Sequence, residues 1–113
     1  MKFKTTLLLT GSLFVAMAGL SPVHAAADEA AAQALAKKND CFKCHAVDKS
    51  KKGPAFQKVA ATYKGNAGAE DKLSKFLTTG GKIKVDGAEE DHKALDTKDA
   101  KEVKNLVQWI LSR

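Results

Sequence analysis

The sequence predicts an all-α domain with about four short helices and long loops between them. Apolar side chains recur at helical spacing in several segments, and no convincing run alternates apolar and polar residues for the length of a strand. The stretch at residues 82–87 alternates over only four residues, which is too few to build a sheet. The chain has 113 residues, enough for one domain and no more.

Residues 1–25 have the pattern of a secretory signal peptide. A basic start that includes Lys2 precedes an apolar run at residues 7–20, which is too short to span a bilayer comfortably. Small residues up to Ala25 match the pattern that a signal peptidase recognises. We therefore expect export and cleavage after Ala25, which leaves a single domain at residues 26–113. An uncleaved anchor helix is the competing interpretation, and the short apolar run disfavours it.

The mature domain is basic and poor in large side chains. The formal charge of the whole chain is +6, and it falls by two to +4 when Lys2 and Lys4 leave with the signal. This charge favours encounter with acidic partner surfaces. Nucleic acid is a weaker interpretation, because the lysines are scattered and aromatic residues do not alternate with them. A domain this short has a marginal core, which a bound apolar cofactor would supplement.

The first half of the mature domain should contain one helix and a long loop. Asp28 can cap an alanine-rich helix at residues 29–38, and Asn39 and Asp40 then end it. Residues 46–58 are rich in lysine and include a Gly-Pro turn signal, so we expect a loop there.

The second half should contain three helical segments. A short helical turn is expected at residues 56–63, and a longer helix at residues 69–79 is stopped by two glycines. Asp99 and Glu102 stand three residues apart in the manner of a capping box at the start of the closing helix. An apolar stripe at helical spacing follows: Val103, Leu106, Val107, Ile110 and Leu111. We interpret this stripe as core.

Cys41, Cys44 and His45 form a Cys-x-x-Cys-His motif. Two thiols three positions apart can each add to one vinyl group of a single haem, giving two thioether bonds. The residue directly after the second cysteine then lies beneath the macrocycle, where an imidazole can meet the iron. We therefore expect one covalently attached haem c, with Cys41 and Cys44 as anchors and His45 as the proximal iron ligand. Export agrees with this interpretation, because c-type haem is attached outside the cytoplasm.

Two other uses of the motif are less consistent with the sequence. A structural zinc site would require a second pair of ligands at a suitable spacing, yet the chain has no further cysteine. A redox-active dithiol usually lies in a βαβ context, which this chain lacks.

Over nearly the whole mature length, the sequence resembles the short bacterial class I cytochromes c. The stretches that carry the resemblance are AKKNDCFKCHAVDKSKKGPAF, then AGAEDKLSKFLTTGG, then a closing helix that ends in LVQWILSR. The resemblance implies a periplasmic electron carrier in which the first and last helices cross while the rest of the chain wraps the haem. It also implies that the carbonyl of Pro54 accepts a hydrogen bond from the His45 imidazole, orienting it. Trp109 corresponds to the core aromatic residue of the closing helix.

The chain departs from this family at the sixth ligand of the iron. The family places a methionine before the closing helix, but the methionines here are Met1 and Met17, both within the expected signal. His92 and Lys93 stand close to the expected place. Reference pKa values are about 10.4 for lysine and 6.5 for histidine. Removing the proton from a lysine nitrogen at pH 7 therefore costs about 5 kcal/mol, whereas a histidine nitrogen is already mostly free. We therefore expect His92 as the second axial ligand, with Lys93 as the alternative.

The expected function is periplasmic single-electron transfer by a monomeric, bis-histidine cytochrome with a lowered reduction potential. The alternative is a protein that binds or senses a small ligand such as CO or NO at a labile or open sixth position. We expect no enzymatic activity, because a ligated His92 would block the iron. Peroxide cleavage by a haem enzyme is also helped by a cationic group beside a distal base, and the only arginine is Arg113 at the terminus.

The expected partners are redox proteins that bind transiently through acidic surfaces. Lysines near the haem edge, among them Lys49, Lys51 and Lys52, would attract such surfaces. Tyr63, Lys64 and Lys84 are candidates for contact with the haem propionates.

Overall fold

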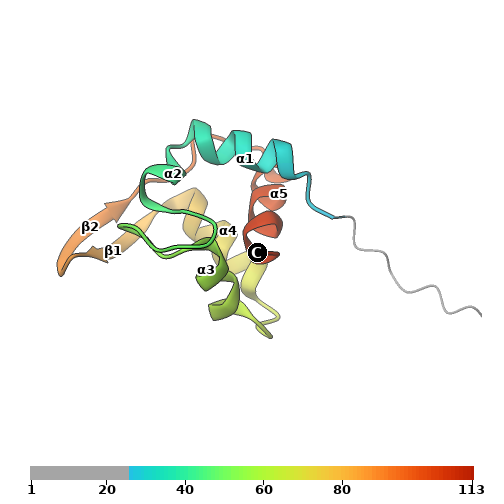
Figure 1. Ribbon diagram of the computed structural model, residues 1–113. Coiled ribbons are helices and arrows are strands. Elements are labelled where there is room, and N and C mark those ends of the chain that lie inside the picture. The colour runs from blue at the N-terminus through green and yellow to red at the C-terminus, as the bar shows by residue number, and fades with distance from the viewer. Residues whose placement is uncertain (1–25) are drawn as a thin grey trace, which may run out of the picture.

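The computed structural model describes residues 26–113, so the expected signal segment at residues 1–25 lies outside the described residues. Within residues 26–113 the elements are α1 (Glu29–Lys38), α2 (Cys41–Cys44), α3 (Phe56–Tyr63), α4 (Ala69–Thr79), β1 (Gly81–Val85), β2 (Ala88–His92) and α5 (Ala100–Leu111). The structure is mostly helical, as expected (Figure 1). No helix in this part of the chain is long and apolar enough to cross a membrane.

Helix α1 begins and ends as its local sequence predicts. The carboxylate of Asp28 accepts a hydrogen bond from the amide of Ala31, which satisfies one free amide of the first turn. At the other end Asn39 is the C-cap residue, and its amide donates to the carbonyl of Leu35. The alanines of α1 allow a close approach to another helix, and Ala32 and Ala36 are almost fully buried.

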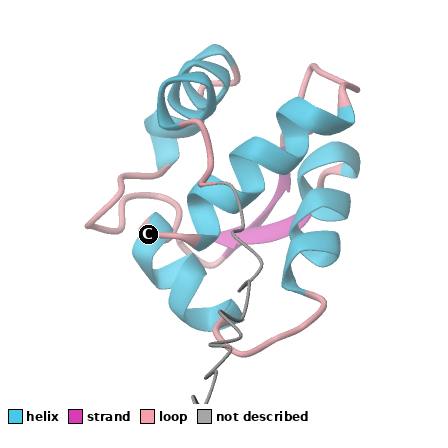
Figure 2. Cartoon of the chain, turned by 90° about the vertical axis from the view of Figure 1, so that its right-hand side faces the viewer, coloured by secondary structure: helices cyan, strands magenta, loops and turns pink. Residues whose placement is uncertain are grey.

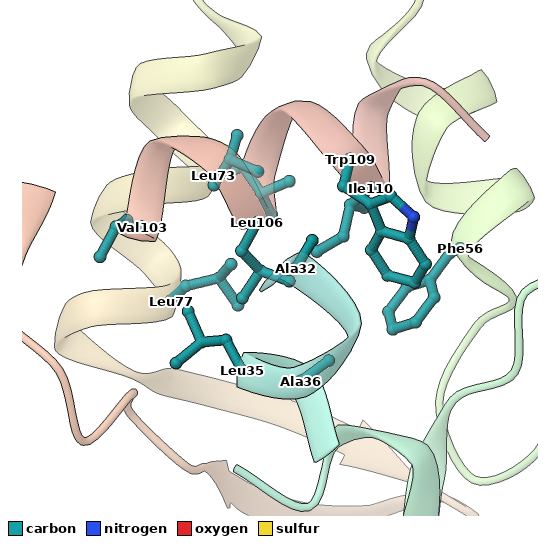
Figure 3. Packing of buried hydrophobic residues seen from close by; sticks show 11 residues of the cluster. Ala32, Leu35, Ala36, Phe56, Leu73, Leu77, Val103, Leu106, Trp109 and Ile110 are labelled. Carbon is teal, nitrogen blue, oxygen red and sulfur yellow. The ribbon is translucent and has the colours of Figure 1, made fainter. Parts of the chain in front are cut away.

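Helix α5 is the central element of the core. It packs against α1, α3 and α4, and its apolar stripe faces all three. Figure 3 shows its side chains interleaved with those of the other helices, with the Trp109 indole beside the Phe56 ring. The centroids of these two rings are 5.4 Å apart in an edge-to-face arrangement. The expectation that this stripe forms core is therefore confirmed.

The start of α5 differs in detail from a capping box. Asp99 Oδ1 accepts hydrogen bonds from the amides of Lys101 and Glu102, as the cap requires. The Glu102 carboxylate, however, accepts from the hydroxyl of Thr97, and that hydroxyl accepts from the amide of Asp99. In a capping box the Glu102 carboxylate would accept directly from the Asp99 amide, whereas here the Thr97 hydroxyl lies between these two groups.

The expectation of no sheet was wrong, because residues 81–92 form a two-stranded antiparallel hairpin. β1 and β2 pair from Gly81 opposite His92 to Val85 opposite Ala88. The two residues of the turn, Asp86 and Gly87, both have positive φ, which matches the right-handed twist of a hairpin. The hairpin projects from the helices in Figure 1 and is the magenta pair in Figure 2.

Trp109 should contribute more to stability than any other single side chain of α5. It is 1% exposed, and its indole N–H makes no hydrogen bond among the described residues. We predict that Trp109→Ala lowers the free energy of unfolding by about 3–5 kcal/mol. Trp109→Phe should lose less than half of that, because the phenyl ring keeps much of the packing and no hydrogen bond of the indole is lost. Denaturant unfolding of the haem-loaded protein measures both, and equal losses would contradict the packing account.

Candidate functional site

A cavity of about 550 Å³ lies between the helices and the hairpin. It is bounded by the end of α1, by α2 and the loop after it, by α3 and α4, by the hairpin, and by α5. Its apolar lining includes Phe56, Val59, Leu73, Phe76, Leu77, Ile83, Val85, Leu95, Leu106 and Ile110. Such a lining suits a large, mostly apolar group with a few polar contacts.

Cys41 and Cys44 reach the cavity from the single turn of α2. Both thiols are unpaired and half-buried, and both residues line the cavity. Burial raises the pKa of the Cys41 thiol above its ordinary value, while its backbone hydrogen bond and the charge of Lys93 act in the opposite direction. The chain leaves the helix at His45, whose amide donates to the carbonyl of Cys41 and whose backbone is extended.

The His45 ring is held on both of its faces and through one nitrogen. Its Nδ1 lies 2.7 Å from the carbonyl oxygen of Pro54, so Nδ1–H donates and leaves Nε2 free to bind a metal. The ring stacks on Phe56, with centroids 5.3 Å apart and planes inclined by 16°. A Cβ atom on Gly53 would lie 2.4 Å from His45 Cε1, so only glycine leaves room for the ring in this position.

His92 lies at the end of β2, across the cavity from His45. The centroids of the two imidazoles are 6.2 Å apart, and their planes are inclined by 51°. The His92 ring also contacts Phe76, with centroids 4.8 Å apart, and its Nδ1 lies 3.0 Å from the carbonyl oxygen of Lys93. Both histidines can therefore direct Nε2 into the cavity while Nδ1–H donates to a backbone carbonyl.

Burial lowers the pKa of His92 below its ordinary value, and the adjacent His45 ring acts in the same direction. The hydrogen bond to the carbonyl of Lys93 opposes these two effects. The imidazole is therefore favoured in its neutral form, which is the form that binds a metal.

The other side chains singled out in the sequence divide into two groups. Tyr63, Lys84 and Lys93 line the cavity, whereas Lys64 lies at a separate hollow beside the end of α5. The ammonium of Lys93 is 3.8 Å from the carboxylate of Asp40, so in this structure it is paired with an acid.

The lysines of the loop after α2 also differ in whether they line the cavity. Lys51 donates to the carbonyl of Phe42 at 2.7 Å, which ties it to α2, and Lys52 lines the cavity.

Sequence reasoning missed the side chains that fix the two imidazoles. Phe56 and Phe76 appeared in the sequence only as apolar residues, and Gly53 only as part of a turn signal. An aromatic residue two positions after Gly-Pro was a usable signal for Phe56. Phe76 could not be found this way, because its contact with His92 depends on how the hairpin folds back on α4.

The residues present fit a haem. Two cysteines and one imidazole lie on one side, a second imidazole lies opposite, and the walls between them are mostly apolar. Among residues 26–113, no three side chains of histidine, cysteine, aspartate or glutamate group as a metal site. Cys41 and Cys44 would hold such a group covalently, and the imidazoles of His45 and His92 could reach its iron.

Comparison with known proteins agrees with the fold. Residues 29–113 match the family described as Cytochrome c. The chain is 42% identical over 90 residues to cytochrome c2 of Rhodocyclus tenuis, covering 76% of this chain and 92% of the relative. It is 36% identical over 104 residues to cytochrome c-552 of Hydrogenobacter thermophilus, covering 88% and 94%.

Solved structures give the same result. The class 1 cytochrome MtoD from Sideroxydans lithotrophicus ES-1 superposes with a TM-score of 0.74 at 53% identity, covering 77% of this chain and 97% of the other. Wild-type cytochrome c552 of Nitrosomonas europaea superposes with a TM-score of 0.59 at 31% identity, covering 71% and 96%.

Gly53→Ala should displace the His45 imidazole, because the new methyl group would overlap the ring. In the haem-loaded protein we predict a weakened bond between the iron and His45, visible as a shifted Soret band and an altered ferric EPR spectrum. Gly68→Ala is the matched control, since the nearest atom to its added Cβ is 3.5 Å away. Identical spectra for Gly53→Ala and wild type would show that the ring does not need this space.

Proposed function

This chain belongs to the cytochrome c family, and we propose that it is a single-electron carrier whose haem iron is bound by both His45 and His92. Members of the family are electron-carrying proteins with one covalently attached haem c. The haem supplies one reversible electron as its iron changes between the ferric and ferrous states. The remaining task of the protein is to hold the haem rigidly and to set its potential.

The distance between the two imidazoles is the observation that carries the proposal. Two imidazoles on one metal place their centroids about 6 Å apart, which is two metal–nitrogen bonds of about 2 Å plus a ring radius of about 1 Å on each side. The centroids of His45 and His92 are 6.2 Å apart. The Nδ1 hydrogen bonds to the carbonyls of Pro54 and Lys93 leave Nε2 as the metal-binding nitrogen on both sides.

On the proximal side, α2 would hold the haem through Cys41 and Cys44 and present His45 to the iron. The carbonyl of Pro54 accepts a hydrogen bond from Nδ1–H of His45, which increases the electron donation of the imidazole. Phe56 fixes the plane of the ring by stacking on it. A ligand held in this way changes little when the iron gains or loses an electron, and small structural change favours fast electron transfer.

On the distal side, His92 would take the place of the family's methionine. A thioether favours ferrous iron, whereas a second imidazole donates more strongly and favours ferric iron. The reduction potential should therefore lie below that of a relative with one histidine and one methionine.

Lys93 is a weaker candidate for this position. Its ammonium pairs with Asp40 and would have to lose both that partner and a proton before it could bind the iron.

We further propose periplasmic transfer between transient redox partners. The periplasmic location depends on the signal pattern at residues 1–25, whose removal would leave residues 26–113 as a single cytochrome domain that we take to act as a monomer. The relatives are electron carriers and are generally not enzymes, and a second imidazole on the iron would leave no position for a substrate.

Replacement of His92 tests the ligand. We predict that His92→Ala loses the low-spin ferric EPR signal of the wild type and that the ferrous variant binds CO quickly and completely. His92→Met should raise the midpoint potential by on the order of 0.1 V, within the roughly 0.8 V range that axial ligands span. Lys93→Ala is the control and should keep the wild-type spectrum. An unchanged low-spin signal in His92→Ala would remove His92 from the iron.

The charge of the cavity rim should control encounter with acidic partners. Lys43 and Lys52 are exposed and border the cavity. We predict that Lys52→Glu slows electron transfer from the ferrous protein to the anion ferricyanide severalfold at low salt, and that the difference shrinks as salt is added. Lys101→Glu, on the first turn of α5, changes the charge equally away from the cavity and should react like the wild type. Equal slowing in both variants would show that only net charge matters.

A further inference from the structure

We propose that Asn39 positions His92 by fastening the chain behind this histidine to the end of α1. This inference rests on the proposed ligation of the iron by His92. Asn39 itself does not touch His92, so its effect would be on the equilibrium between a docked and an undocked distal segment, defined here as residues 93–96.

Asn39 is a buried polar residue with an unusual set of partners. It is 6% exposed, although it is the C-cap of α1 and borders the cavity. Its Nδ2 donates to the carbonyl of Leu35 at 3.0 Å, and its Oδ1 accepts from the amide of Asp96 at 3.0 Å. The second bond joins residues 57 positions apart in sequence. The side chain therefore connects the end of α1 to the distal segment.

The two hydrogen bonds of this side chain are not equivalent. The carbonyl of Leu35 also accepts from the backbone amide of Asn39 at 3.1 Å, so it keeps a partner without the side chain. The amide of Asp96 has no other acceptor among the hydrogen bonds of the described residues. The oxygen of Asn39 is thus the part of the side chain that the distal segment needs.

The distal segment transmits this attachment to His92 because it is short. The amide of Leu95 donates to the carbonyl of Leu77 on α4 at 2.8 Å, which gives the segment a second fixed point. On the other side, His92 pairs with Gly81 in the hairpin. His92 is therefore held between the hairpin and two hydrogen bonds within the next four residues.

Nearby ion pairs are a weaker form of attachment. Lys38 and Asp96 approach to 3.5 Å and Lys93 and Asp40 to 3.8 Å, but all four side chains are largely exposed. Exposed pairs contribute little and are screened by salt. The buried hydrogen bond from Asp96 to Asn39 is accordingly the stronger constraint.

The position of Asn39 in the chain gives the attachment a functional meaning. Asn39 precedes Cys41 by two residues, so the turn that starts the haem-attachment helix also holds the segment that follows the distal histidine. When His92 leaves the iron, the segment can undock and the Asp96 amide can bond to water. Without the Asn39 oxygen, the docked state leaves this partly buried amide unsatisfied and is destabilised relative to the undocked state.

The test is CO binding to the ferrous holoprotein, because CO must wait for His92 to leave. Asn39→Ala should raise the observed rate of CO binding about tenfold, which is the effect of leaving one buried donor unsatisfied. A high-spin ferric fraction should appear in parallel. The matched control is Asn105→Ala. Asn105 also bridges two segments, because its side chain hydrogen-bonds to the amide and the carbonyl of Asp28 at 2.7 and 2.9 Å. Asn105 is not among the residues that line the cavity, so this control should lower the unfolding free energy without changing CO binding.

A second variant covers the case in which Asn39→Ala folds poorly. Asn39→Gln keeps a neutral side-chain amide whose oxygen can still accept from the Asp96 amide, and it adds no charge at this buried position. Its rate of CO binding should stay within about threefold of the wild type, since the unique acceptor remains.

The outcomes separate this inference from the proposed ligand. If His92→Ala opens the iron to CO while Asn39→Ala behaves like Asn105→Ala, Asn39 is only a structural residue and the inference is overturned. Fast CO binding in Asn39→Gln equal to that of His92→Ala would overturn it as well. If His92→Ala instead binds CO no faster than the wild type, the proposed ligand fails, and the role of Asn39 fails with it.

Discussion

Two imidazoles face each other across a cavity that no side chain of the described residues fills, and the rest of the fold is arranged to keep them there. The 6.2 Å between the His45 and His92 centroids matches the spacing set by one metal with two nitrogen ligands. Helix α5 contributes both to the core and to the wall of the cavity, since Trp109 packs in the core while Ile110 borders the cavity. A chain of this length gains stability from a bound apolar group, so cofactor binding and folding are expected to be linked.

The two sides of the cavity are built by different kinds of interaction. The proximal side is local: His45 bonds to a carbonyl nine residues away, and Gly53 bonds back to the carbonyl of Cys44. The distal side depends on contacts between distant parts of the sequence, namely the hairpin, Phe76 on α4 and Asn39 at the end of α1. Under the proposed ligation, His45 should therefore stay on the iron more persistently than His92, and variation in the chemistry of the haem should arise on the distal side.

This difference explains how much could be predicted from sequence. Caps and apolar periodicity act within a few residues, so helices at residues 29–38, 56–63 and 69–79 were predicted with the bounds that the structure has. The hairpin was missed because β2 is mostly acidic and exposed. Its pairing comes from the Asp86–Gly87 turn and from pairs such as Lys82 with Asp91. The role of Asn39 could not be inferred, because in sequence a C-cap asparagine indicates only the end of a helix.

The hairpin register also has a consequence for the evolution of such proteins. Gly81 lies at the base of the hairpin, and the residue paired with it is set by the number of residues in β2 after the turn. Loss of one residue from β2 would bring Lys93 to the place of His92, and a gain of one would bring Asp91 there. A single codon inserted or deleted could thus exchange an imidazole for an amine or a carboxylate. Under the proposed ligation by His92, the identity of the ligand would depend on strand length as well as on residue type, so natural variation could change the ligand without a new fold.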